Sequence, residues 1–274
     1  MPVVLSIFNP TLFAIYIIAF LLIWFVKAVG LNIRSLQGFR MMSQQSKLDW
    51  RPLLDDLEAG GLLHPDTKQP SWHEHNVKRL DVRPLCMRPS EVIHALIVAS
   101  YNESKDILEP TIKSVLASKF DMKKVILVMA YEGRDGAQSE EAALELVQEY
   151  RNEFMHAFAT KHPLTEGEVR GKGGNVTYAG RELQKYLESK QIDPSRVIVT
   201  TLDADNRPHP NYLSSLTYTY CSTEDPRYVS YQPVVTYTNN IWDAPSPMRV
   251  IATGSMFWNV VLSMRPHMLR NFSS

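Results

Sequence analysis

Cysteine is almost absent from this chain, with only Cys86 and Cys221 among 274 residues. The two lie far apart and in no metal-binding spacing, which disfavours a disulfide framework and a structural zinc site and predicts reduced thiols. A surplus of either charge is also lacking, because 29 Lys and Arg residues balance 29 Asp and Glu residues. Without a basic surface, nucleic acid is not expected to be a partner.

Two common nucleotide-binding motifs are missing as well. No G-x-G-x-x-G follows a strand pattern, which argues against a dinucleotide-dependent dehydrogenase. A P-loop fails on two counts: Gly167 and Gly171 are separated by three residues rather than four, and Gly173 stands where Ser or Thr should follow the lysine.

The N-terminal run Leu12–Val26 lacks every charged side chain. With its flanking residues it has about the twenty apolar positions that a membrane-spanning helix needs. No basic segment precedes Pro10, as a cleaved signal peptide would require. The positive residues all follow the run, which predicts a cell-membrane protein whose remaining chain lies in the cytoplasm; they are Lys27, Arg34, Arg40 and Lys47.

Three segments are expected along the chain: a transmembrane anchor at 1–30, a connector at 31–90 and one domain at 91–274. Helical apolar spacing marks Leu48–Leu57 within the connector, and glycines and prolines punctuate its second half. No further ligands at metal spacing accompany the three histidines of the connector, which are predicted to be solvated loop residues; they are His64, His73 and His75.

From Glu91 onwards, strand and helix patterns alternate. Such alternation predicts an α/β fold with a Rossmann-like, mainly parallel sheet. The predicted strands are Val92–Ala99, Val125–Ala130, Phe154–Thr160, Arg196–Leu202 and Tyr228–Val234. The predicted helices are Asp106–Leu116, Ala137–Tyr150, Lys172–Leu187 and His209–Cys221.

In open α/β sheets, ligands bind at the carboxyl ends of the strands, so polar residues at those ends are site candidates. Arg196–Leu202 is followed by Asp203-Ala204-Asp205. Alternation along an extended chain places both carboxylates on one face and Ala204 on the other. Two convergent carboxylates can hold Mg²⁺ or Mn²⁺ together with a diphosphate that the cation bridges.

Two further segments join this set. Ser100-Tyr101-Asn102-Glu103 follows the first strand, where an aromatic ring can stack on a base and a carboxylate can bond to a base or ribose. The same segment can also cap a helix, through Asn102 or Ser104. The glycine-rich stretch 170–175 carries Lys172 at the start of a helix, which suits a phosphate.

These elements, in this order, resemble membrane-bound family 2 glycosyltransferases of GT-A fold, and the cellulose-synthase-like branch in particular. The resemblance covers roughly residues 92–240. It implies an inverting transfer of a sugar from a nucleoside-diphosphate donor to a glycan or lipid acceptor. It also implies that Tyr101 and Glu103 border the nucleoside, Lys172 and Asn175 lie near the nucleotide, Asp203 contacts the donor and Asp205 ligates the cation.

The chain departs from the family at two places. Where the family has a base-reading aspartate after the second strand, this sequence offers Glu132 as a substitute. Thr223-Glu224-Asp225 imitates the family's general base but follows the aspartates too closely, so a loop is expected there and no catalytic base is assigned. No Gln-x-x-Arg-Trp acceptor segment occurs. We therefore expect an N-terminal fragment whose acceptor half is missing.

Two other functions remain open at this point. A sugar nucleotidyltransferase shares the alternating layout but requires a glycine-rich basic loop after the first strand. A non-catalytic, membrane-anchored nucleotide-binding scaffold is the second alternative, and metal-dependent nucleotide binding distinguishes it from the enzyme.

Overall fold

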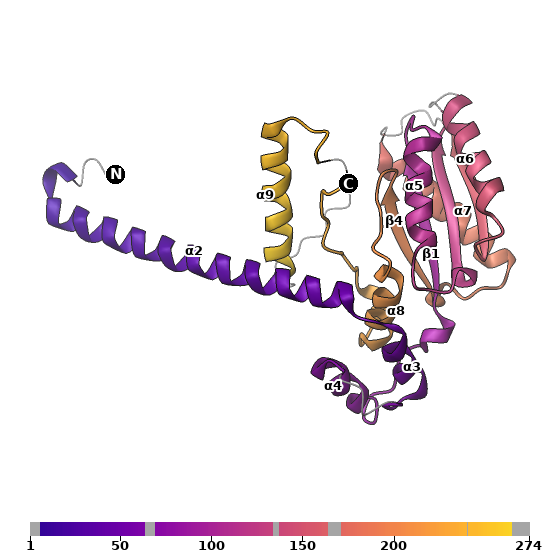
Figure 1. Ribbon diagram of the computed structural model, residues 1–274, viewed down its shortest axis with the longest axis horizontal. Helices are drawn as coiled ribbons and strands as arrows, with labels where there is room; N and C mark the ends of the chain where they lie inside the picture. The colour runs from indigo at the N-terminus through magenta and orange to yellow at the C-terminus, as the bar shows by residue number, and fades with distance from the viewer. Residues whose placement is uncertain (1–5, 64–68, 134–136, 164–170, 240, 265–274) are drawn as a thin grey trace. The chain divides into compact units, whose positions relative to one another are not determined.

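The computed structural model describes residues 6–63, 69–133, 137–163, 171–239 and 241–264 (Figure 1). By its contacts the chain divides into two compact units. The sheet unit runs from Leu48 to Tyr231, and the helical unit joins the segment that ends at Lys47 to the segment that begins at Gln232. In sequence, the sheet unit is therefore inserted between the two parts of the helical unit.

A four-stranded parallel sheet forms the centre of the sheet unit. Its strand order is β3-β2-β1-β4, and the strands are β1 (Ile93–Ser100), β2 (Val125–Glu132), β3 (His156–His162) and β4 (Val197–Asp203). In the register, Ser100 lies beside Tyr131 and Ala99 beside Asp203. The carboxyl ends of β1, β2 and β4 therefore meet at one edge. The predicted α/β fold with an apolar N-terminal helix is confirmed.

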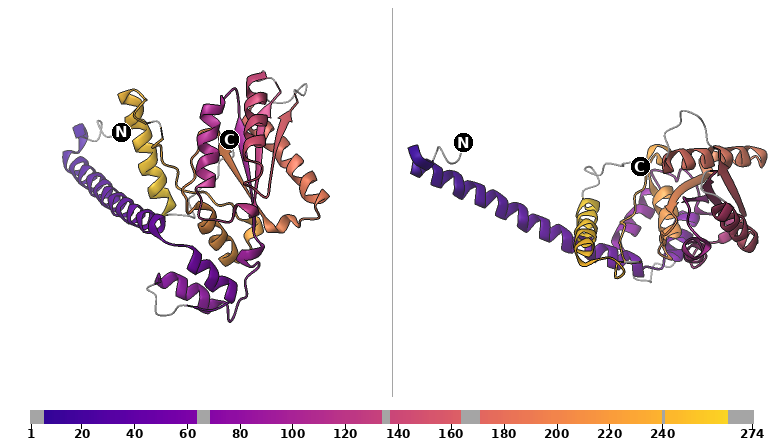
Figure 2. Two further views of the ribbon diagram at one scale, coloured as in Figure 1. Left: turned by 45° about the vertical axis from the view of Figure 1, so that its right-hand side comes forward. Right: turned by 90° about the horizontal axis from the view of Figure 1, so that it is seen from above.

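Helices cover both faces of the sheet (Figure 2). On one face lie α5 (Lys105–Leu116) and α6 (Ala137–Tyr150), and on the other lies α7 (Lys172–Ser189). Successive residues of β1 point to opposite faces: Leu96 packs with α5 and α6, whereas Ile97 packs with α7. This two-sided burial explains why β1 and β2 are continuous apolar runs.

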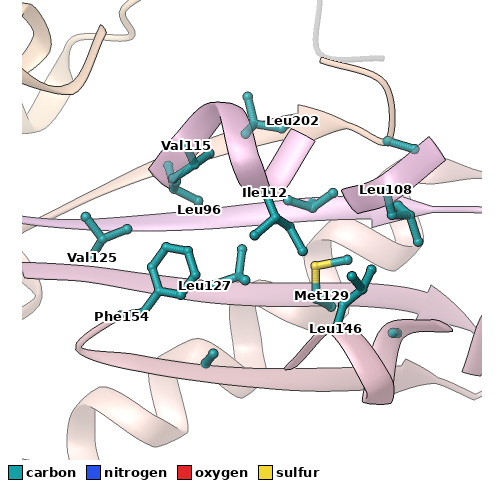
Figure 3. Packing of buried hydrophobic residues seen from close by; sticks show 14 of the residues in the cluster. Leu96, Leu108, Ile112, Val115, Val125, Leu127, Met129, Leu146, Phe154 and Leu202 are labelled. Atoms are coloured by element: carbon teal, nitrogen blue, oxygen red, sulfur yellow. The ribbon is translucent and has the colours of Figure 1, made fainter. Parts of the chain in front are cut away.

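The cluster beneath α5 and α6 is the largest hydrophobic core of the sheet unit (Figure 3). Leu96, Ile112 and Leu127 are each fully buried there. Burying one such side chain contributes about 1.5–3 kcal/mol to the free energy of unfolding. The core anchors β1 and α5 together, so the turn that joins them at residues 101–104 has fixed ends.

The predicted strand at Tyr228–Val234 is wrong. Pro226–Tyr228 forms a 3₁₀ helix, and residues 229–238 have no strand pairing. The valines and tyrosines of this stretch favour a strand, but Pro233 has no backbone N–H to give to a ladder. The predicted third strand is confirmed with a shift, since Phe154–Thr160 was expected and His156–His162 is observed.

A second hydrophobic cluster reaches the sheet through Ile198 of β4. It packs α3 (Arg51–Ala59) and α4 (Ser71–Arg79) against α8 (Tyr212–Ser222) and includes Trp50, Leu57 and Cys221. The helix expected from the spacing of Leu48–Leu57 is confirmed as α3. Residues 48–90 of the predicted connector therefore belong to the sheet unit, to which α3 and α4 contribute a packed helical layer, whereas residues 31–47 continue helix α2 of the helical unit.

His73 corrects the prediction of solvated loop histidines. It lies within α4 with its side chain fully buried, whereas His75 is exposed and His64 lies outside the described residues. His73 Nε2 is 3.0 Å from the Asp56 carboxylate, and Nδ1 is 2.7 Å from the Tyr218 hydroxyl. The helical spacing of His73 and Val77 places both on the face that packs inward.

The Asp56 carboxylate is the acceptor at the centre of this buried network. It also accepts hydrogen bonds from the Leu63 N–H and from the Gln69 side-chain amide, each at 2.8 Å. Burial alone would raise the pKa of Asp56, but these hydrogen bonds, the one from His73 and the charge of His73 together hold it below its ordinary value. A lowered carboxyl pKa stabilises the fold above the ordinary pKa, and that contribution is lost as the pH falls.

We therefore predict that Asp56→Asn destabilises the chain at neutral pH. Removing one partner from a buried, hydrogen-bonded pair costs about 2–4 kcal/mol, so the melting temperature should fall by roughly 5–10 °C. The variant should also lose less stability than the wild type as the pH drops below about 4, where the Asp56 carboxylate becomes protonated. Thermal melts of the purified chain in detergent measure both effects.

The exposed neighbour Asp55 provides the control, Asp55→Asn. Equal melting of the two variants would contradict a stabilising role for the network.

The helical unit contains α2 (Pro10–Lys47) and α9 (Ser246–Ser263). In its most apolar window, α2 has a mean hydropathy of 2.5 and no buried residue. Among the described residues it alone is long and apolar enough to cross a membrane, judged by length and composition. Gly38 is its one buried described residue, and a Cβ there would lie 2.7 Å from Val260 of α9. Close approach of the two helices thus requires glycine at this position.

Candidate functional site

One cavity of about 560 Å³ opens at the carboxyl edge of the sheet. Its walls come from the ends of β1, β2 and β4, from the start of α5 and from the first turn of α7. All seven residues that the sequence singles out line this cavity: Tyr101, Glu103, Glu132, Lys172, Asn175, Asp203 and Asp205. The parallel register explains this, because it brings strand ends that are distant in sequence to the same edge.

The aspartate pair after β4 has the predicted alternation. Asp203 and Asp205 are exposed to the cavity side, whereas Leu202 and Ala204 are buried. The Ala204 carbonyl accepts a 2.6 Å hydrogen bond from the Thr111 hydroxyl of α5. That bond holds the residue between the two carboxylates against the core, so both carboxylates project from a fixed backbone.

The turn after β1 presents Tyr101, which is 56% exposed, at the mouth of the cavity. The Tyr101 N–H donates a hydrogen bond to the Glu103 carboxylate within the turn. Asn102 has a backbone φ of 61°, in the left-handed region that asparagine tolerates better than most residues. The ring and the carboxylate are thus positioned by a short, locally hydrogen-bonded turn.

The helix cap expected from this turn is corrected in one respect. Ser104 occupies the N-cap position of α5, but its side chain makes no capping hydrogen bond. Asn102 lies outside the helix, where its left-handed backbone lets the chain reverse into α5. The asparagine is therefore favoured by backbone conformation rather than by capping chemistry.

The glycine-rich stretch is helical from Lys172 onwards. Gly173 and Gly174 lie in the first turn of α7, and Gly171 is its extended N-cap residue. A Cβ on Gly171 would meet no atom within 4 Å, which leaves the backbone at the start of α7 open to the cavity. Residues 164–170, which include Arg170, lie outside the described part of the chain. An open N-terminus of an 18-residue helix favours a negatively charged group.

Lys172 and Asp203 form an ion pair between α7 and β4. The lysine side chain is 36% exposed and the aspartate side chain 56%, so solvent screens the pair. The cavity therefore places one positive charge beside a pair of negative ones, in reach of the helix N-terminus.

Asn175 lies beneath the cavity with 1% of its surface exposed. Its amide nitrogen donates to the Ala130 carbonyl at 3.0 Å and to the Ser100 carbonyl at 3.3 Å. Its side-chain oxygen is buried and has no hydrogen-bond partner among the described residues. Asn175 thus ties the carboxyl ends of β1 and β2 to α7, a structural role that the sequence does not reveal.

Glu132 is the last residue of β2 and lines the cavity with 8% of its surface exposed. It lies beside His162 in the register, and the following Gly133 N–H donates to the His162 carbonyl at 2.8 Å. Ile107 of α5 also lines the cavity, although the sequence analysis does not identify it. Its side chain is 45% exposed, whereas Leu108 and Ile112 on the buried face of the same helix are fully buried, a difference that only the structure shows.

Thr223-Glu224-Asp225 lies in the predicted loop, between the end of α8 and the 3₁₀ helix at Pro226–Tyr228. Glu224 forms an ion pair with Arg83. None of the three residues lines the cavity.

The carboxylate ligands available in the cavity fit a hard divalent cation that is also coordinated by a substrate. Among the described residues, no three or more His, Cys, Asp or Glu side chains cluster as a metal site. Asp203 and Asp205 supply carboxylate oxygens on one face of the cavity. Mg²⁺ is commonly bound by one or two carboxylates together with substrate phosphates and water. The pair suits that mode and does not form an all-protein cage.

Comparisons with known proteins add little to this geometry. No family model and no curated protein matches the chain. Four solved chains match, among them the crystal structure of S. aureus TarS residues 1–349, a family 2 glycosyltransferase. That match has 18% sequence identity and a TM-score of 0.35, and it covers 55% of this chain but only 44% of the TarS chain. We draw no conclusion about this chain from so partial a likeness.

We predict that Asn175→Ala destabilises the sheet unit. The substitution removes two hydrogen bonds to buried strand ends, which should lower the free energy of unfolding by about 1–3 kcal/mol. Asn175→Asp should cost at least as much, because a carboxylate would face two carbonyl oxygens. Thermal melts in detergent measure the effect. Gln184→Ala is the control, because Gln184 lies on the exposed surface of α7 and bonds only within that helix. Melting of the Asn175 variants at the control temperature would refute the role assigned to this residue.

Proposed function

We propose that this chain is the donor-binding part of a membrane-tethered, nucleotide-sugar-dependent glycosyltransferase of GT-A type. The observation that carries the proposal is the convergence of all seven predicted site residues on one cavity at the carboxyl edge of the parallel sheet. These residues come from four separate parts of the sequence, and the fold brings all of them to one cavity.

The proposed roles follow from position in the cavity. Tyr101 at the mouth offers a ring face for a nucleoside base, and Glu103 and Glu132 offer carboxylates to base or ribose donors. Lys172 and the open N-terminus of α7 offer positive charge to a diphosphate. Asp203 and Asp205 would hold Mg²⁺ or Mn²⁺ against the same diphosphate. One side of the cavity thus serves the nucleoside and the other the diphosphate.

The proposed reaction is an inverting displacement at the anomeric carbon, in which an acceptor hydroxyl replaces the nucleoside diphosphate. A divalent cation in the aspartate pair would supply charge compensation for the leaving diphosphate. Lys172 and α7 would orient the diphosphate, and Tyr101 would fix the nucleoside end. We assign no general base, since the four carboxylates of the cavity are accounted for by the donor and the cation.

The nucleotidyltransferase alternative is less well supported. It requires a glycine-rich, basic loop after the first strand, whereas β1 is followed by a short glycine-free turn into α5 at Lys105. The non-catalytic scaffold differs from the enzyme by its chemistry rather than by its fold, so a binding measurement separates the two.

We expect nucleoside-diphosphate binding to require a divalent cation and Asp205. Asp205→Ala removes a charge-compensating ligand, which should weaken the affinity by about a hundredfold. Calorimetry with UDP and GDP, in Mg²⁺, in Mn²⁺ and in chelator, measures this on the purified chain in detergent. Asp225→Ala, outside the cavity, is the matched control and should leave the affinity unchanged. Equal affinity in chelator, or in Asp205→Ala, would rule out the proposed site.

We also propose that α2 anchors the chain in a cell membrane, with the sheet unit on the cytoplasmic side. Support comes from the exposed apolar window of α2 and from the lysine and arginine residues that follow it.

Deletion of residues 1–30 should therefore move the protein from the membrane to the soluble fraction. The intact chain should stay with membranes in alkaline carbonate and be released by detergent, since its attachment is hydrophobic. Fractionation and immunoblotting follow both proteins, and the deleted chain must keep the wild-type melting temperature of the sheet unit for the comparison to hold. Release of the intact chain by carbonate alone would show that α2 does not span the bilayer.

A further inference from the structure

Lys172 and a bound divalent cation would compete for the Asp203 carboxylate. Asp203 forms an ion pair with the Lys172 ammonium, and a divalent cation held by Asp203 and Asp205 would need the same carboxylate. An ammonium in contact with this carboxylate repels a divalent cation at the same place. Lysine bound to Asp203 and a divalent cation bound to Asp203 are therefore competing arrangements.

A second observation points to a ligand in this cavity independently of the acidic pair. Asn175 lines the same cavity, is nine-tenths buried or more, and has a side-chain oxygen without a partner among the described residues. A buried amide oxygen without a hydrogen bond costs free energy, which a bound donor group or a bridging water can recover. Asn175 lies one helical turn after Lys172, so both side chains are on the face of α7 that lines the cavity.

A diphosphate changes the competition for Asp203. Its oxygens offer the lysine a negatively charged partner beside the open N-terminus of α7. The flexible four-carbon stem of lysine lets the ammonium move between such partners. Once the ammonium has left, both carboxylates can face one divalent cation.

We propose that Lys172 is an exchangeable counter-ion, which holds Asp203 until a diphosphate takes over its charge and releases the carboxylate to a divalent cation. The proposal rests on the function proposed above and specifies how the binding of its two ligands is coupled. Cation binding and diphosphate binding are then positively coupled, and by linkage each raises the affinity for the other by the same factor. Lys172 is a positioning residue in this scheme, since it controls which partner Asp203 has.

The test is a Mn²⁺ titration of the purified chain in detergent, followed by electron paramagnetic resonance, first without nucleotide. Lys172→Met keeps the length of the side chain and removes the charge. It should bind Mn²⁺ about fivefold more tightly than the wild type, since an exposed ion pair and a charge repulsion are both removed. Lys172→Arg keeps the charge and should bind Mn²⁺ like the wild type. Lys185→Met is the control, because Lys185 lies on the same helix and pairs with Glu182 outside the cavity.

The titrations are then repeated with saturating UDP, with the Mn²⁺–UDP complex in protein-free buffer subtracted. In the wild type, UDP should raise Mn²⁺ affinity at least about fivefold. Lys172→Met should show a smaller factor, because only the direct contact between the cation and the diphosphate then couples the two ligands. Unchanged or weaker Mn²⁺ binding by Lys172→Met without nucleotide, in a variant with the wild-type melting temperature, would overturn the proposal. Failure of any nucleotide to bind in Mn²⁺ would instead overturn the proposed function, while the nucleotide-free titration still decides the competition for Asp203.

Discussion

The parallel register of β1 with its two neighbours is the constraint on which the rest of the site depends. It puts Ala99, Ala130 and Asp203 at one level near the carboxyl edge of the sheet. The cavity exists because the chain leaves the sheet there in different directions, towards α5, towards α6 and towards α8. Asn175 reinforces this edge from below, by bonding to the carbonyls of two strands at once. The groups that line the cavity are therefore supported by the same interactions that hold the sheet together.

The charged groups that line the cavity are mostly negative. Four carboxylates line it, and the ammonium of Lys172 is the positive side chain among its described lining residues. The start of α7 adds the partial positive charge of a long helix. Such a site is suited to anions only when positive charge arrives with them. A nucleoside diphosphate that enters together with a divalent cation satisfies this requirement, and a free anion does not.

Sequence reasoning succeeded where periodicity and strand-end chemistry dominate. The apolar runs of β1 and β2 and the alternation of Asp203 and Asp205 depend on local geometry alone, so they could be predicted. The strand expected at Tyr228 failed because strand formation depends on a pairing partner and Pro233 removes a donor. His73 was missed because its burial is decided by Asp56 and Tyr218, which are far away in sequence. The structural role of Asn175 was hidden for the same reason.

The close contact between Gly38 and Val260 has a consequence for the order of folding. Roughly two hundred residues separate the two positions, so closing that loop in an unfolded chain carries a large entropic cost. Folding of the inserted sheet unit from Leu48 to Tyr231 shortens the effective loop before the helices meet. During synthesis, α2 emerges long before α9 exists. The contact between Gly38 of α2 and Val260 of α9 can therefore form only after the whole sheet unit has been synthesised.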